Sequence, residues 1–320
     1  MGRQKVLVRR RRRLPSGLAR AAIAFSLLAL ASAGCATPSG NSRAGGPAAQ
    51  RAKLDGLCFS PFVNEDPSSP VPITHEQIAA LIDKIAPYTK GIRTFSSSGL
   101  GGDIARTAKS KGLFVAAGCD LYTDPAHNAE EVDSLVRLAS EGSVDLAVVG
   151  EEALYFNFVP ESELIGYIER VKKTGVKATT SDTWGALVGH PRVVAACDVL
   201  MANMFPYWED QGIIGSVGYL DSCYRKTAEA ARGKEVVVET GWPSAGEPKG
   251  KAVASPGNAD WFLSRFTSWA EVGNVKYFYF EAFDEPWKAS HEGAVGAHWG
   301  LWDQYGNLKP GVAAIIGTGR

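Results

Sequence analysis

Residues 236–244 read Val-Val-Val-Glu-Thr-Gly-Trp-Pro-Ser, an apolar run that ends in a carboxylate. The three valines predict a strand that is buried on both faces, as the strands of parallel sheets are. The glycine and proline that follow interrupt this strand, so Glu239 is expected at its C-terminal end. Charged residues at strand ends are often only solvated loop residues. Whether Glu239 does more depends on the rest of the chain.

Seven more strand-like runs alternate with helix-like ones. The eight runs are residues 54–61, 91–97, 113–121, 144–152, 177–184, 197–207, 235–242 and 276–283. After the first run, residues 74–77 predict a capping box, and apolar residues then recur at helical spacing from Ile78 to Ile85. Eight such units predict a single (β/α)8 TIM barrel, whose functional side chains gather at the C-terminal ends of the strands. An open doubly wound sheet is the alternative, but no glycine-rich phosphate loop follows the first run.

Length and charge narrow the class of protein. The chain has 320 residues, of which 45% are apolar, so it can bury one large core. Basic and acidic residues both total 34, but the first 34 positions hold eight basic residues and no acidic ones. The rest of the chain therefore has 26 basic and 34 acidic residues, a net charge of −8. This balance argues against nucleic acid as a partner of the folded domain.

The N-terminus has the pattern of an export signal. Five arginines at 9–13 precede an apolar stretch, 21–30, that is too short to span a membrane. Residues 32–35, Ser-Ala-Gly-Cys, resemble a bacterial lipobox, in which the signal is cleaved before a cysteine that is then acylated. We therefore expect an exported protein, held at a bacterial membrane by a lipid on Cys35. The alternatives are an ordinary secreted protein or a basic tail that binds nucleic acid.

These patterns predict three segments. Residues 1–34 form a lipoprotein-type signal peptide, and residues 35–53, rich in Ala, Gly, Ser and Pro, form a flexible tether. Residues 54–320 form the folded catalytic domain, expected to be a monomer.

The four cysteines of the folded domain do not indicate a metal site. Cys58, Cys119, Cys197 and Cys223 are even in number, so disulfides are allowed, but each lies in an apolar stretch and can be a buried thiol. No CxxC spacing occurs, and the five histidines are scattered. No metal and no cofactor is therefore expected.

Carboxylates end three of the predicted strands. The fourth ends in Glu151 and Glu152, the seventh in Glu239, and the eighth leads through Glu281 to Glu285. Cleavage of a glycosidic bond with retention needs two carboxyl groups about 5 to 5.5 Å apart, one to protonate the leaving oxygen and one to attack the anomeric carbon. Strands four and seven of a barrel face each other and can supply this pair. A cation site is the alternative, but the neighbouring aromatic residues suit a sugar better.

Five motifs together resemble glycoside hydrolase family 17, the β-1,3-glucanase and β-1,3-glucanosyltransferase family. They are VVGEEAL (148–154), NMFPYW (203–208), VVVETGWPSAG (236–246), YFYFEAFDEPWK (277–288) and HWGLWDQYGNLKP (298–310). The resemblance covers roughly residues 54–312. It implies a (β/α)8 barrel, a retaining mechanism and a β-glucan substrate. Matched by motif, Glu239 is the nucleophile and Glu152 the general acid/base.

Further residues are predicted to bind the sugar. Arg93, at the end of the second strand, is expected beside Glu239 and would keep it ionised; an arginine that only joins loops is the alternative. Asn203 is expected to contact the sugar. The other predicted contacts are aromatic platforms and charged residues that match family positions: Tyr207, Trp208, Trp242, Trp287, Glu281, Glu285 and Lys288.

One position departs from the family pattern. The residue before the acid/base is commonly Asn, which can donate a hydrogen bond to a sugar hydroxyl. Here it is Glu151, which accepts hydrogen bonds unless it is protonated. A register in which Glu152 replaces that Asn is disfavoured, because Ala153 and Leu154 match the residues after the acid/base. Glu151 is still expected near the substrate.

The sequence thus predicts a cofactor-free, retaining β-1,3-glucanase of the endo type, from the bacterial branch of the family. A glucanosyltransferase is one alternative, because it would use the same pair and pass the glycosyl unit from Glu239 to another sugar. A tethered carbohydrate-binding protein without catalysis is the other, and Glu151 is its only motivation.

Overall fold

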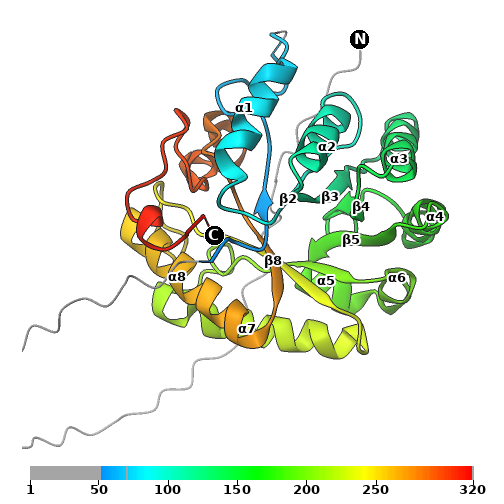
Figure 1. Cartoon of the computed structure of the whole chain (residues 1–320). Coiled ribbons are helices and arrows are strands. Elements are labelled where there is room, and N and C mark those ends of the chain that lie inside the picture. The colour runs from blue at the N-terminus through cyan, green and yellow to red at the C-terminus, as the bar shows by residue number, and fades with distance from the viewer. Residues whose placement is uncertain (1–51, 70, 319–320) are drawn as a thin grey trace, which may run out of the picture.

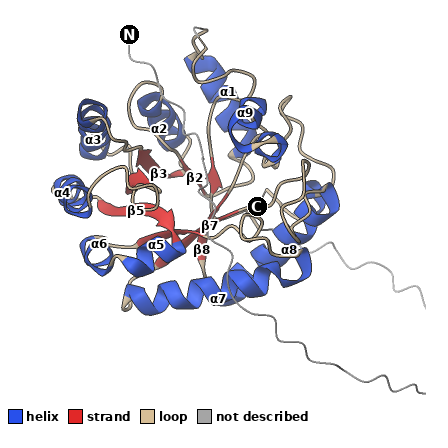
Figure 2. Ribbon diagram, turned by 180° about the vertical axis from the view of Figure 1, so that it is seen from behind, coloured by secondary structure: helices blue, strands red, loops and turns tan. Residues whose placement is uncertain are grey.

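Alternating apolar strands and amphipathic helices close into a barrel. The structure, a computed structural model, describes residues 52–69 and 71–318. Eight parallel strands form a closed barrel in the order β1 to β8, so the predicted single (β/α)8 fold is confirmed. Helices surround the strands in Figure 1, and the view from behind in Figure 2 shows the strands at the centre of the ring.

The strands are shorter than the predicted runs but lie within them. They are β1 (Leu57–Cys58), β2 (Gly91–Arg93), β3 (Phe114–Cys119), β4 (Leu146–Glu151), β5 (Lys177–Thr183), β6 (Leu200–Asn203), β7 (Val236–Thr240) and β8 (Lys276–Tyr279). Apolar runs extend beyond the hydrogen-bonded ladder because the chain stays buried as it enters the loops. The three valines of β7 are buried, as expected for a parallel strand covered on both faces.

The helices cover the outside of the barrel. They are α1 (His75–Ile85), α2 (Gly101–Ser110), α3 (Pro125–Ser140), α4 (Glu161–Lys172), α5 (Trp184–Gly189), α6 (Pro191–Ala196), α7 (Ile213–Ala231), α8 (Pro256–Gly273) and α9 (Ala289–Glu292). Short 3₁₀ turns follow β8, at η1 (Pro286–Lys288), η2 (Ala294–His298) and η3 (Val312–Ala314). The predicted capping box of α1 is confirmed, because Thr74 and Gln77 exchange side-chain-to-backbone hydrogen bonds.

Some of the segments predicted from the sequence lie outside the residues that the structure describes. The predicted signal peptide, Cys35 and the tether up to residue 51 lie outside the described residues. Within residues 52–69 and 71–318, no helix is long and apolar enough to cross a membrane.

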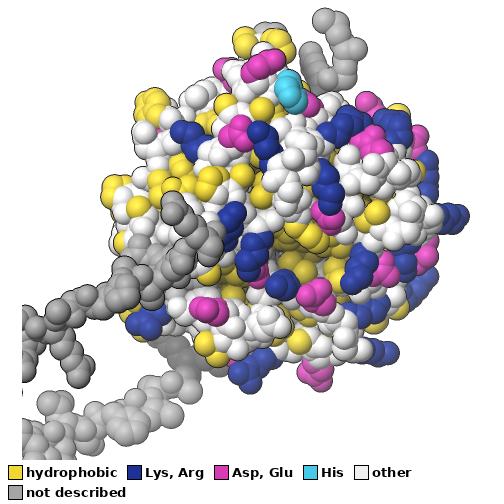
Figure 3. Space-filling view, in the orientation of Figure 1, with side chains coloured by type: hydrophobic (Ala, Val, Ile, Leu, Met, Phe, Trp, Pro, Cys, Tyr) yellow, Lys and Arg dark blue, Asp and Glu magenta, His cyan; other side chains and the backbone are white. Residues whose placement is uncertain are grey.

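The four cysteines of the folded domain are buried free thiols. On the face shown in Figure 3, basic and acidic side chains are interspersed, with hydrophobic ones between them.

Two glycines shape the strand ends nearest the predicted catalytic residues. Gly150 has φ +87° and lies where the β4–β5 register shifts, so β4 bulges just before Glu151. Gly241 follows β7, and a Cβ there would lie 2.0 Å from the carbonyl oxygen of Phe280. Glycine is therefore favoured at the first position by its backbone conformation, and at the second by the close approach of the chain after β8.

Candidate active site

The predicted polar residues of four strands converge at the C-terminal end of the barrel. Arg93 ends β2, Glu151 ends β4, Asn203 ends β6 and Glu239 lies near the end of β7. Asn203 and Glu239 are direct neighbours in the β6–β7 register. All four side chains are buried, so their charges are shielded from water and act strongly on one another.

Arg93 lies between two carboxylates. Its Nη2 donates a hydrogen bond to Oε2 of Glu151, and its Nε lies 3.3 Å from Oε2 of Glu239. Arg93 and Glu239 are each 1% exposed. Burial opposes the charge of the guanidinium, but Glu151 and then Glu239 raise the pKa of Arg93 above its ordinary value. The expected placement of Arg93 beside Glu239 is therefore observed, and the arginine stays charged.

Asn203 joins the two adjacent glutamates at the end of β4, Glu151 and Glu152. Its Nδ2 donates to Oε1 of Glu151 at 2.9 Å and to Oε1 of Glu152 at 3.2 Å. Ser181 Oγ donates to Asn203 Oδ1 at 2.9 Å, which fixes the amide with its nitrogen toward the glutamates. A continuous series of polar contacts therefore links Glu152 to Glu239 through Asn203, Glu151 and Arg93.

Glu151 is held by two groups of the protein. It binds Arg93 and Asn203, and its side chain is only 10% exposed. The carboxylate thus receives two donors from the protein itself. Whether it also contacts substrate stays a prediction.

Glu152 borders a pocket of about 300 Å³. Aromatic and polar side chains from the loops after β4 and β6 and from the junction of β5 with α5 line it together with Glu152: Tyr155, Phe156, Thr183, Trp184 and Glu209. A sugar could pack an apolar face on these rings while its linking oxygen lies near Glu152. A larger pocket, about 420 Å³, lies between α1 and residues 304–306 and includes none of the predicted site residues.

The charged residues after β8 form a buried cluster. Lys288 contacts the carboxylates of both Glu281 and Glu285, and Ser60 donates to Glu285. Burial raises the pKa of Glu281 well above its usual value, and Lys288 opposes this shift. Glu281 and Glu285 are each 1% exposed. The three predicted residues therefore lie together and neutralise one another in part, and their contact with substrate stays a prediction.

The predicted aromatic platforms divide into two pairs. Tyr207 and Trp242 are each 1% exposed and pack edge to face with centroids 5.5 Å apart. Their faces are covered, so the prediction that they stack on sugar rings is wrong. Trp208 and Trp287 are partly exposed, so each can still offer part of its surface. The tail residue Trp299 packs against Tyr207 and Trp208 and contributes to this burial.

Sequence reasoning missed the polar residues of β5. Residues 179–182, Thr-Thr-Ser-Asp, are all fully buried although they are polar. Ser181 orients Asn203, and Asp182 accepts backbone hydrogen bonds from the loop that follows Glu152. The sequence does contain a signal for these residues. Four polar residues in succession inside a barrel strand are buried, and buried polar groups need hydrogen-bond partners.

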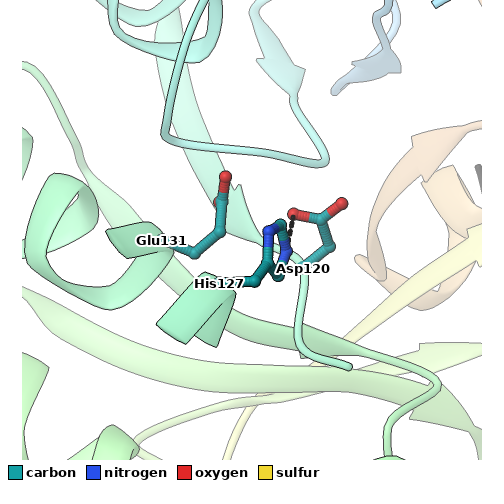
Figure 4. Close-up of side chains that lie close together, drawn as sticks. All are labelled: Asp120, His127 and Glu131. Atoms are coloured by element: carbon teal, nitrogen blue, oxygen red, sulfur yellow. Dashed lines mark ion pairs between the residues drawn. The ribbon is translucent and has the colours of Figure 1, made fainter. Parts of the chain in front are cut away.

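A third group of ionisable side chains lies near the end of β3. Figure 4 shows Asp120, His127 and Glu131 side by side. Their carboxylate oxygens and imidazole nitrogen, which are atoms of the kind that bind metal ions, lie within 4.8 Å of one another. His127 Nε2 is 3.7 Å from Asp120 Oδ1. Both oxygens of Glu131 already accept hydrogen bonds from residues 96–98, so this carboxylate holds the β2–α2 loop. We therefore interpret this group as one that stabilises the β2–α2 loop, not as a metal site.

The chain matches known glycoside hydrolases along most of its length. Residues 56–300 match the family model of the BtgE/BtgC glycoside hydrolase domain. A glucan 1,3-beta-glucosidase of Saccharomyces cerevisiae is 28% identical over 257 residues, which cover 71% of this chain and 82% of that protein. A probable beta-glucosidase btgE of Aspergillus flavus is 29% identical over 78% of this chain, but the match spans only 42% of that longer protein.

Solved structures give the same result. A glycoside hydrolase family 17 β-1,3-glucanosyltransferase from Rhizomucor miehei superposes with a TM-score of 0.72 at 30% identity. The match covers 81% of this chain and 96% of that one. An endo-laminarinase from Formosa superposes with a TM-score of 0.68 at 18% identity, which supports the fold alone.

Proposed function

The chain belongs to the BtgE/BtgC glycoside hydrolase family, related to glycoside hydrolase family 17, and from that premise we propose that it cleaves β-1,3-glucan with retention. Glu239 is the nucleophile in this proposal and Glu152 the acid/base. The observation that carries it is the series of contacts that joins these two glutamates through Arg93, Glu151 and Asn203. Double displacement requires two carboxyl groups close together, and this series holds two at one end of the barrel.

The environment of Glu239 suits a nucleophile. Arg93, fully buried and charged, lies against its carboxylate and favours the ionised form, which is the form that attacks. The carboxylate sits on β7, between the ladders of β6 and β8, so its position is fixed by backbone hydrogen bonds on both sides.

The chemistry then follows in two steps. An oxygen of Glu239 attacks the anomeric carbon, the glycosidic bond breaks, and the leaving sugar oxygen takes the proton of Glu152. In the second step Glu152, now a carboxylate, removes a proton from water, whose oxygen attacks the same carbon and releases Glu239. Two inversions give net retention. The two proposed steps use only the two glutamates and water.

Transglycosylation is the second candidate function. The pocket beside Glu152 has aromatic walls from Tyr155, Phe156 and Trp184, so a second sugar could occupy it after the leaving group departs. That sugar would replace water as the acceptor and yield a longer chain. The relative from Rhizomucor miehei is itself a glucanosyltransferase.

One experiment separates the candidates. Incubation with laminari-oligosaccharides of a single length should give shorter products only if the enzyme is a hydrolase, and both shorter and longer ones if it transfers. Unchanged oligosaccharides would contradict both functions and leave a carbohydrate-binding protein. Endo action predicts internal cleavage, seen as products of several lengths from the first minutes.

We also propose export and anchoring from the N-terminal sequence. Residues 1–34 would direct export, Cys35 would carry the lipid, and residues 36–53 would connect it to the domain at 54–320. The curated relatives named above are fungal, so placement in a bacterial branch rests on this lipobox-like sequence alone. The tether would let a monomeric enzyme reach glucan near the membrane surface.

A further inference from the structure

Asp182 is a buried carboxyl that none of the predicted roles includes. It lies near the end of β5 and is 0% exposed. Its Oδ2 accepts a hydrogen bond from the backbone nitrogen of Leu154 at 2.8 Å and lies 3.4 Å from that of Tyr155. Its Oδ1 accepts from the backbone nitrogen of Thr183 at 2.8 Å. The side chain therefore ties β5 to the loop that begins directly after Glu152.

Glu152 needs this support because its backbone is unusual. Its φ is +48°, in the left-handed region that residues other than glycine adopt rarely and at a cost. Such a conformation persists only where neighbours hold it. The backbone nitrogen of Glu152 donates to the carbonyl of Ser181 at 2.8 Å, and Asp182 holds the chain two residues further on. Ser181 and Asp182, two successive residues of β5, thus stabilise the turn that contains Glu152.

Glu152 also acts on Asp182 through its charge. Burial, followed by the charge of Glu152, raises the pKa of Asp182 to about 8. The backbone donors Leu154 and Thr183 oppose this shift, and Glu151 adds to it weakly. The β6 neighbour of Asp182 in the ladder is Ala202, which carries no charge. The charged groups that act on Asp182 therefore come from the end of β4.

We propose that Asp182 is a positioning residue for the acid/base: it holds the turn after Glu152 so that this side chain faces the glycosidic oxygen. The inference rests on the proposed function. Loss of the tie would let the turn relax, and Glu152 would then point away from the scissile bond. Because a displaced acid fails to protonate the leaving group, the defect should appear only where the leaving group needs a proton.

The test compares two substrates in the Asp182→Asn variant, which keeps the size of the side chain but cannot accept from all three backbone donors. On a laminari-oligosaccharide, kcat/KM should fall about 10²-fold, chiefly through kcat. On a 2,4-dinitrophenyl β-glucoside, whose leaving group needs no proton, kcat/KM should change less than about threefold. A burst of dinitrophenolate should precede steady state, because the second step still needs Glu152 as base.

A matched control bonds to the other end of the same strand. Asp198, which precedes β6, accepts from the backbone nitrogen of Ala178 in β5 at 2.9 Å. The Asp198→Asn variant makes the same substitution at a carboxylate that bonds to β5 at the end opposite to Asp182, and it should leave the ratio of the two substrates unchanged. If Asp182→Asn does not fold, Asp182→Ser keeps one acceptor in a smaller side chain and is measured instead.

The outcomes are distinct. Equal loss of activity on both substrates, or loss on neither, would overturn the positioning role. A wild-type protein inactive on both substrates would instead contradict the proposed function. A double variant gives a second readout: with Glu152 already replaced by Gln, Asp182→Asn should cause no further loss on the oligosaccharide, because there is no acid left to position.

Discussion

The side-chain nitrogen of Asn203 lies 3.2 Å from Oε1 of Glu152. The same nitrogen donates to Glu151, and Ser181 fixes the amide from its other side. The sequence predicts that Asn203 contacts a sugar, and the structure adds hydrogen bonds to both glutamates. We infer that Asn203 holds Glu152, the proposed acid/base, in place beside Glu151.

Replacement of Asn203 should reveal this role. In Asn203→Asp the donor is lost and a further carboxylate enters a buried site, so we expect kcat/KM on laminari-oligosaccharides to fall about 10²-fold or more. Ser181→Ala removes only the bond that orients the amide and should cost about tenfold or less. Steady-state kinetics of both variants decide the point. Equal rates in Asn203→Asp and wild type would rule out the role.

The catalytic pair can be assigned by substitution and rescue. Glu239→Gln should lower turnover about 10⁴-fold or more on every substrate, because no covalent glycosyl intermediate can form. Glu152→Ala should spare the first step on aryl glycosides with good leaving groups, and azide should then rescue it and give a β-glucosyl azide. The anomeric configuration is read by NMR. An α-azide would reverse the two assignments.

The positions of the glutamates at the strand ends could be predicted from the sequence, because the end of an apolar run marks the end of a strand. In β4 and β7 an apolar run stops directly at a glutamate, and a barrel brings all such ends to one rim. Arg93, Asn203 and Glu239 lie together because the strands that carry them end at the same rim of the barrel. The residues that carry the family resemblance lie at these same ends.

Side-chain direction and burial could not be predicted in the same way. Gly150 adopts a positive φ and makes β4 bulge, so simple alternation does not apply to the two glutamates that follow. Tyr207 is buried partly by Trp299, a residue more than ninety positions away in a tail whose path the strand pattern does not specify. Contacts made by loops and tails depend on packing that local patterns do not encode.

Anchoring is tested by one substitution in the full chain. Cys35→Ala removes the only thiol in the lipobox-like sequence, so the protein should move from the membrane fraction to the soluble envelope fraction. Fractionation and immunoblotting measure the distribution, and wild-type protein should also gain mass from its acyl chains. Membrane association that survives the substitution would refute the anchor.

Stability should depend on pH through Asp182. Burial, followed by the charge of Glu152, raises the pKa of this group in the folded protein to about 8, whereas the unfolded chain titrates near the ordinary value for Asp. Between about pH 4 and pH 8 the folded state therefore binds more protons than the unfolded state, so this group's contribution to stability is present at low pH and is lost as pH rises through 8.

The Asp182→Asn variant removes this dependence. The free energy of unfolding of wild type relative to the variant should fall by up to about 1.4 kcal/mol per pH unit as pH rises from 5 to 8. Urea unfolding at four pH values measures the difference. Asp198→Asn, which replaces a carboxylate bonded to the opposite end of β5, is the reference. Parallel curves for wild type and Asp182→Asn would show that the carboxyl is already ionised throughout this range.

The last prediction concerns Glu151, which stands where the family commonly has Asn. In the structure it pairs with Arg93 and shares Asn203 with Glu152. Its negative charge neutralises part of the charge of Arg93. Glu151→Asn removes this charge and puts an amide, which can donate a hydrogen bond, in its place.

The Glu151→Asn variant offers a donor that a sugar hydroxyl can use, so KM on a β-1,3-glucan oligomer should fall or stay the same. Glu151→Gln also offers a donor and keeps the length of the side chain, so it should change KM in the same direction. Both variants are compared with wild type by steady-state kinetics on one β-1,3-glucan oligomer, and a KM that rises in both would show that a donor at this position does not help to bind the sugar.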